Sequence, residues 1–174
     1  HIENLIEKGI KFIFYPCITH ENLKTEHGDN CFNCPIVISY PEVIHNNVDS
    51  IKENDLLFMH PFLPIDHEKK MINRVYEELQ VFDIDESEVK AAVTKAYQEL
   101  ALYRSDIQKA GEKALEYIRN NHIKGIVLAG RPYHVDPQIN HGIPEMINSL
   151  GMAVLTEDSV SHLGYHEYPL RVVN

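Results

Sequence analysis

The sequence has no long run of apolar residues. A membrane-spanning helix needs roughly 18 or more consecutive apolar residues, and no segment of this chain of 174 residues approaches that length. The first residues have the spacing of an amphipathic helix, with Ile2, Leu5 and Ile6 on one face, and not the pattern of a secretory signal. We therefore expect no membrane partner and predict a cytoplasmic location.

The chain also has few basic residues. It contains 16 Lys and Arg against 26 Asp and Glu, which gives a formal net charge of -10 at pH 7. A surface of this charge repels the phosphates of nucleic acids and of anionic membranes. Nucleic acid is therefore not expected as a partner.

Three widespread functional motifs are missing. The sequence lacks a phosphate-binding loop with Gly-Lys-Ser/Thr, a dinucleotide-binding Gly-x-Gly-x-x-Gly turn and a Gly-x-Ser-x-Gly nucleophile elbow. We do not expect ATP hydrolysis, nicotinamide chemistry or serine hydrolysis from this segment. Because the chain begins at His1 inside a predicted helix, we also expect it to be a piece of a longer protein.

Short apolar segments alternate with helical segments along the chain. Four of the apolar segments are predicted strands, and the first has the composition of a strand buried on both faces of a parallel sheet. These segments cover residues 10–15, 56–59, 123–129 and 152–155. The alternation predicts an α/β fold with mostly parallel strands, whose carboxyl ends meet at the edge where such sheets bind ligands.

The strongest helical pattern covers residues 86–121. Apolar residues recur there at steps of four and three, from Val89 to Tyr117, as one apolar seam. A continuous helix of this length would measure roughly 50 Å. We predict one long helix; the alternative is two helices with a hinge near Gly111.

The two ends of the chain resemble each other. Lys8-Gly9-Ile10 and Lys124-Gly125-Ile126 each lead into a predicted strand, and both ends carry a helical Pro-Glu-x-Ile. We predict two related βαβ halves, with chance similarity as the alternative. The expected domains are a first lobe with the cysteine loop over 1–65, a helical connection over 66–122 and a second lobe over 123–174.

All three cysteines lie in the first half of the chain. Cys17 follows the first predicted strand, and Cys31 and Cys34 form a Cys-x-x-Cys pair that leads into a helix. In a cytosolic chain this set favours metal, cluster or redox use over a disulfide framework. Three thiolates could hold a [4Fe-4S] cluster, or zinc with His20 or His27 as fourth ligand, or they could remain free or transiently oxidised. Spacing alone does not separate these alternatives.

A second candidate site follows the third predicted strand. A glycine there allows a ligand to approach the backbone, and an arginine offers a planar guanidinium to a carboxylate or phosphate, such as that of an acyl-CoA. The candidate ligand-binding residues are Arg131, Tyr133, His134, Asp136, Asn140 and His141. The alternatives are ordinary structural roles for these side chains, or a divalent metal held by His134, Asp136, His141 and Asp158.

The motifs together resemble one known family. The chain is similar to the uncharacterised domain of large activator-like proteins related to 2-hydroxyacyl-CoA (2-hydroxyglutaryl-CoA) dehydratase activators. The resemblance covers nearly the whole chain, and its motifs are Phe14-Tyr-Pro-Cys17, Asn33-Cys-Pro-Ile-Val-Ile-Ser-Tyr-Pro-Glu42, Gly130-Arg-Pro-Tyr-His-Val-Asp-Pro137, Asn140-His-Gly-Ile-Pro144 and Glu157-Asp158.

This resemblance implies a part in ATP-driven, low-potential electron transfer in anaerobic bacteria. In the family, the domain accompanies ATPase activator and dehydratase-like modules, which would be its partners, and related activators pass electrons to a dehydratase that holds iron–sulfur clusters. Cys17, Cys31 and Cys34 would then be cluster ligands. The ATPase motifs are not in this segment, so we do not expect it to be active alone. The competing hypothesis is a non-catalytic interaction domain with a structural zinc or free thiols.

Overall fold

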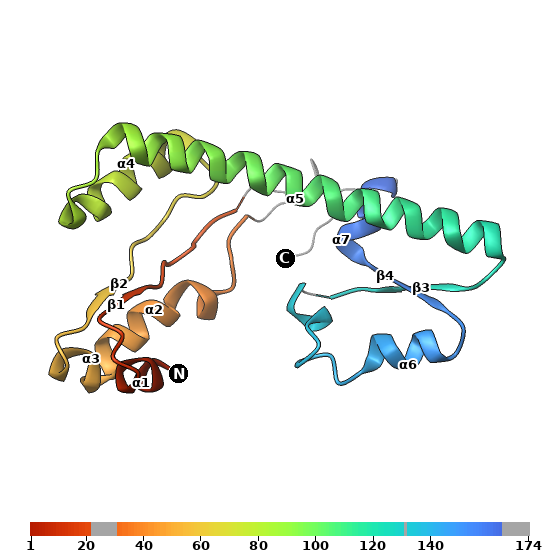
Figure 1. Ribbon diagram of the computed structural model, residues 1–174, viewed down its shortest axis with the longest axis horizontal. Coiled ribbons are helices and arrows are strands. Elements are labelled where there is room, and N and C mark those ends of the chain that lie inside the picture. The colour runs from red at the N-terminus through yellow and green to blue at the C-terminus, as the bar shows by residue number, and fades with distance from the viewer. Residues whose placement is uncertain (22–30, 131, 165–174) are drawn as a thin grey trace. The chain divides into compact units, whose positions relative to one another are not determined.

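The computed structural model describes residues 1–21, 31–130 and 132–164 (Figure 1). The contacts divide the chain into two compact units, and the division falls between Ala96 and Tyr97. Each unit contains one pair of parallel strands, which confirms the predicted α/β fold class. In the described part of the chain, no helix has the length and apolar character needed to cross a bilayer.

Unit 1 is built on a parallel pair of strands. β1 (Phe12–Phe14) pairs with β2 (Leu57–Met59), with Ile13 opposite Phe58. Parallel strands need a crossover connection, and helices supply it here. The helical elements of this unit are α1 (Ile2–Glu7), α2 (Pro35–Asn47), α3 (Asp49–Glu53), α4 (Glu68–Leu79), η1 (Gln80–Phe82) and the start of α5.

The core of unit 1 lies on one face of this strand pair. Ile51, Leu56 and Phe58 are buried, and partly buried apolar side chains from α1, β1 and α2 pack against them. α2 starts with Pro35, whose fixed φ and missing N–H suit the first turn of a helix. The second proline of this helix, Pro41, is completely buried.

β1 is less buried than its sequence predicts. Phe12 and Phe14 each keep 41% of their surface exposed, whereas Ile13 between them packs against the core. In the described residues β1 has a single strand neighbour, and the buried cluster packs on the face that carries Ile13. The opposite face is covered only in part, where Met59 is buried and the Phe12 ring contacts Phe82 at 5.2 Å. The expectation of a strand buried on both faces is therefore wrong for β1.

Unit 2 repeats the order of elements found in unit 1. β3 (Gly125–Leu128) pairs in parallel with β4 (Ala153–Thr156), and helical segments join them. This order confirms the prediction of two βαβ halves. The helical elements that follow α5 are η2 (Pro132–Val135), α6 (Ile143–Ser149), α7 (Glu157–Val160) and η3 (Ser161–Leu163).

The long helix is continuous. α5 (Glu86–Asn121) has 36 residues and no break at Gly111, which confirms the prediction of one helix (Figure 1). Its apolar seam is not buried along its full length, however. Val89 is only 2% exposed, but Tyr103 and Tyr117 are 62% and 59% exposed. The division into units falls within this helix, and the predicted domain boundaries near 65 and 122 stay a prediction.

Gly111 allows α7 to approach α5 closely within unit 2. A Cβ atom at this position would collide with the backbone carbonyl of Ser159 and lie 2.8 Å from the Ser159 Cβ. The neighbouring residue Glu112 accepts a hydrogen bond from His162 at 2.9 Å. A glycine in a helix interior normally weakens the helix, so close packing explains its presence here.

We predict that Gly111→Ala destabilises the protein by about 1–3 kcal/mol, because the added methyl group overpacks this contact. Helix propensity alone would give the opposite sign, since alanine favours a helix over glycine by about 1 kcal/mol. The free energy of unfolding in urea measures the effect. Lys113→Ala, at an exposed position of the same helix, is the control and should be close to neutral. Stabilisation by Gly111→Ala would contradict the packing of α7 on α5.

Candidate functional site

The backbone of Cys17 is held at the carboxyl edge of the β1–β2 pair. Its N–H donates to the Pro61 carbonyl at 2.8 Å, and its carbonyl accepts from the Leu63 N–H at 3.0 Å. The two bonds continue the strand register, with Cys17 opposite Phe62. The Cys17 side chain is completely buried. The backbone of Cys17 is therefore held at both its N–H and its carbonyl, and this fixes the position of the side chain.

A histidine lies on the same face of the strand pair as Cys17. The register places Tyr15 opposite His60 and Cys17 opposite Phe62, and residues two apart in a strand share a face. The His45 ring of α2 stacks on the His60 ring with 4.2 Å between centroids. α2 therefore contacts this face at the position of His60.

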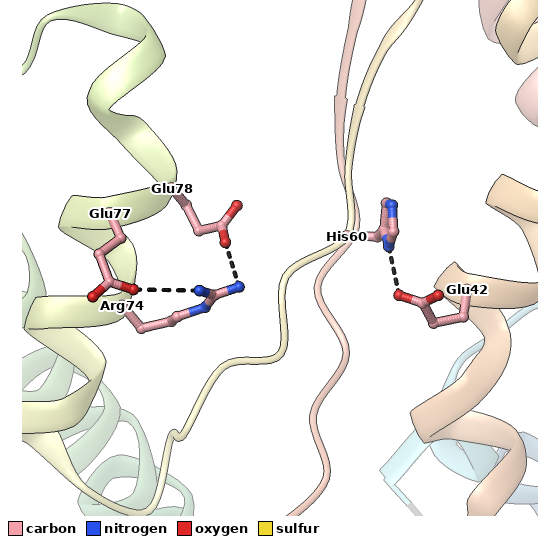
Figure 2. A network of polar contacts seen from close by, with 5 residues as sticks. All are labelled: Glu42, His60, Arg74, Glu77 and Glu78. Carbon is pink, nitrogen blue, oxygen red and sulfur yellow. Dashed lines mark hydrogen bonds and ion pairs between the residues drawn. The ribbon is translucent and has the colours of Figure 1, made fainter.

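Glu42 of α2 orients the His60 ring. Its Oε1 lies 2.7 Å from His60 Nδ1, and Figure 2 shows the carboxylate pointing at the imidazole from the neighbouring helix. An ionised carboxylate only accepts hydrogen bonds, so Nδ1 carries the proton and Nε2 is left as an acceptor when the ring is neutral. No pattern in the sequence pointed to this pair, although His60 directly follows the second predicted strand and Glu42 ends the motif that begins at Asn33.

The surroundings of Cys17 keep its thiol protonated. Burial raises the pKa of Cys17, and the negative charge of Glu42 raises it further. A hydrogen bond from the Glu42 backbone opposes these effects in part. A protonated thiol is a poor nucleophile and must lose its proton before it binds a metal.

Cys31 and Cys34 lie in a more accessible segment. The Cys31 carbonyl accepts from the Glu21 N–H at 2.9 Å, and the Asn33 N–H donates to Thr19 at 3.0 Å, which pairs this segment with the chain just after Cys17. Cys31 is partly exposed and Cys34 is exposed. Both of these thiols can therefore be reached from solvent.

The arrangement does not bring the three thiols together. The Cys17 thiol interacts with Glu42, whereas Cys34 precedes the first turn of the same helix. Eight residues of α-helix correspond to roughly 12 Å along the axis. Within 1–21, 31–130 and 132–164, no group of three His, Cys, Asp or Glu side chains could hold a metal ion. The thiols suit a metal–sulfur centre chemically, and their use as cluster ligands stays a prediction.

Of the two histidines considered as zinc ligands, His20 is paired with an aspartate. His20 Nδ1 lies 3.0 Å from Asp66 Oδ2, so this ring is oriented by a carboxylate of the loop that follows β2. Its ring also makes an edge contact with Phe32, 5.1 Å between centroids. His27 lies outside the described residues. Zinc ligation by either residue stays a prediction.

In the second candidate site, two of the polar residues stabilise turns. Asp136 Oδ1 accepts from the Gln138 N–H at 2.8 Å. Asn140 is 6% exposed; its Oδ1 accepts from the Gly142 N–H at 2.8 Å, and its amide reaches the Val135 carbonyl at 3.4 Å. These contacts give both side chains a structural role in the approach to α6.

Tyr133, His134 and His141 of the second candidate site lie at exposed positions. Tyr133 is 57% exposed, and its ring contacts the His134 ring edge-on at 4.4 Å. His141 adopts a positive φ of 54° in the turn before α6. Arg131 lies outside the described residues. Ligand binding by this loop therefore stays a prediction.

Comparison with protein families identifies the chain. A family model described as the CoA enzyme activase uncharacterised domain matches residues 1–160. The chain belongs to this family. The match covers all four strands and agrees with the resemblance seen in the sequence motifs, and it supports an activator-like protein with activator-type partners. No curated protein and no solved structure matches the chain.

The contrast in burial predicts different reactivities for the thiols of this activase domain. We expect iodoacetamide to alkylate Cys34 first and Cys31 next, and to modify Cys17 only in unfolded protein, since reaction requires an accessible thiolate. Peptide mass spectrometry after timed labelling measures the order. Early labelling of Cys17 in folded protein would contradict its burial.

Stability should also depend on pH through Cys17. A thiol whose pKa is raised by folding stabilises the protein below the unfolded-state pKa, and this contribution is lost as pH rises above it. We therefore expect the gap in unfolding free energy between wild type and Cys17→Ala to be constant at neutral pH and to shrink above pH 9.0, the ordinary thiol value. Urea titrations at several pH values test this. A gap that stays constant across that range would contradict it.

Proposed function

We propose that this domain contributes thiolate ligands for an iron–sulfur centre to its activase-like parent protein, and so takes part in ATP-driven, low-potential electron transfer for radical dehydration of 2-hydroxyacyl-CoA. The observation that carries the proposal is the accessible Cys-x-x-Cys pair at the start of α2, in a chain of the CoA enzyme activase family. When bound, such a centre would supply one-electron transfer at low potential.

The position of Cys34 favours a thiolate. It is the N-cap residue of α2, a helix of 13 residues. The free N–H groups and the dipole at a helix N-terminus stabilise negative charge, and so favour the deprotonated form of a nearby thiol. Exposure of Cys34 leaves its sulfur open to an incoming metal.

Cys17 is the third proposed ligand, and it differs from the other two. Its thiol is buried against Glu42, so it has to lose its proton and approach the start of α2 before it binds. This makes Cys17 the ligand whose recruitment requires a local rearrangement. Cys31 and Cys34 already lie outside the protein core.

The proposed partners follow from the family. They are the ATPase activator and dehydratase-like modules of the parent protein, in the cytoplasm of an anaerobic cell. An acyl-CoA bound by the loop over residues 131–141 belongs to the same proposal.

The apolar surface of α2 favours a second function. Ile36, Val37, Tyr40 and Val43 are each at least 50% exposed and recur at helical spacing. Exposed apolar residues of this kind mark contact surfaces between proteins or modules. In this alternative the domain is a non-catalytic interaction domain, and its thiols hold zinc or no metal.

Metal analysis of the chain after anaerobic reconstitution with iron and sulfide tests the proposal. We expect bound iron and sulfide with visible absorption from sulfur-to-iron charge transfer, and loss of both in Cys31→Ala and in Cys34→Ala. Ser39→Ala, at an exposed position of α2, is the matched control and should retain them. Zinc binding without iron would favour the interaction domain with a structural zinc. Absence of iron in wild type under these conditions would overturn the iron–sulfur proposal.

A further inference from the structure

Unit 1 contains a pocket beside the carboxyl edge of its strand pair. The cavity has a volume of about 400 Å³, which is within the range of small-molecule sites. It lies between the segments that follow β1 and β2 on one side and α4 on the other. The carboxyl edge of parallel strands is where α/β proteins bind ligands.

The pocket has an apolar wall made by consecutive residues. Phe62, Leu63 and Pro64 follow β2 and line it. Phe62 is 47% exposed, a large apolar surface left open to solvent beside the cavity. The hydrogen bond from the Leu63 N–H to the Cys17 carbonyl fixes this wall. The pocket therefore offers a rigid apolar surface to a ligand.

Three of the charged residues that line the pocket already have partners. Asp66 pairs with His20 at 3.0 Å. Arg74 pairs with Glu77 at 3.3 Å and also with Glu78, and Figure 2 shows its guanidinium lying between these two carboxylates. The charges of Asp66, Arg74 and Glu77 are therefore balanced by neighbouring side chains of opposite charge.

The polar groups that remain can all donate hydrogen bonds. The side chains of Lys70, Asn73 and Thr19 line the same pocket and make no hydrogen bond or ion pair within the described residues. Lys70 and Asn73 are three residues apart on α4, so they lie on one face of the helix. One positive charge and neutral donors beside an apolar wall suit a single anionic group on an apolar body.

We propose that this pocket binds a small organic monocarboxylate. The carboxylate contacts the Lys70 ammonium and the Asn73 amide, and the apolar body lies against Phe62 and Pro64. A ligand with two or more negative charges would meet Glu77 and Asp66 in the lining of the pocket without a second free cation. This site is separate from the proposed cysteine ligands and does not depend on a bound metal.

Benzoate is a suitable probe because it has one carboxylate and a flat apolar ring. We expect saturable binding with a dissociation constant on the order of 1 mM, typical of so small a ligand. Lys70→Met should weaken binding about fivefold, the effect of losing one partly solvated ion pair. Lys52→Met, which removes an exposed lysine of α3 outside the pocket, should bind benzoate like wild type.

Chemical-shift titrations of the folded chain at constant ionic strength measure these affinities, with far-UV circular dichroism to confirm that each variant is folded. Benzamide, the neutral isostere, should bind more weakly than benzoate to wild type and equally to wild type and Lys70→Met. Absence of saturable shifts at Phe62 and Lys70 would overturn the proposal. Equal benzoate affinities in Lys70→Met and Lys52→Met would also overturn it.

Discussion

The features of unit 1 depend on the backbone pairing that continues past β1 and β2 to Cys17 and Phe62. Both strands are short, with three residues each, and they gain two further hydrogen bonds where Cys17 pairs with Pro61 and Leu63. Two parallel strands are joined by a long crossover connection, which does not hold their ends together. Hydrogen bonds between the ends therefore matter for the pairing. The Cys17–Phe62 pairing thus determines where the thiol lies relative to α2 and to the wall of the pocket.

This constraint gives the cysteines of this activase domain two different environments. Cys17 is held in the core by its backbone bonds, and burial and the charge of Glu42 raise the pKa of its thiol. Cys34 lies in water at a helix N-terminus, which favours the thiolate. The accessible thiols of the domain are therefore those of Cys31 and Cys34, while the Cys17 thiol lies in the folded core.

The sequence predicts the elements well because their signals are local. Strand-like segments end in prolines or turns, and the 36-residue helix has an apolar period throughout, so both are recognisable without tertiary information. Burial is predicted less well. Phe12 and Phe14 have the composition of a buried strand, but the face that carries them is only partly covered, which leaves each of them 41% exposed.

The candidate site is predicted in part, for a physical reason. Residue types identify the thiols, but the distance between Cys17 and Cys34 depends on which turn of α2 lies against the thiol, and no local pattern specifies that register. Glu42 and His60 are 18 residues apart in the sequence, so their contact can be seen only in the folded chain. The pocket likewise depends on the placement of α4 beside the segment after β2.

The pairing at the edge of β1 and β2 is the central claim, and hydrogen exchange of individual amides tests it most directly. The N–H groups of Cys17 and Leu63 are both donors in this pairing. The structure predicts that these two amides exchange with solvent as slowly as those of Ile51 and Leu56, buried residues whose N–H groups donate to Val48 and Ile51. Exchange of Cys17 and Leu63 as fast as that of exposed amides would show that the pairing does not form, and would contradict the account.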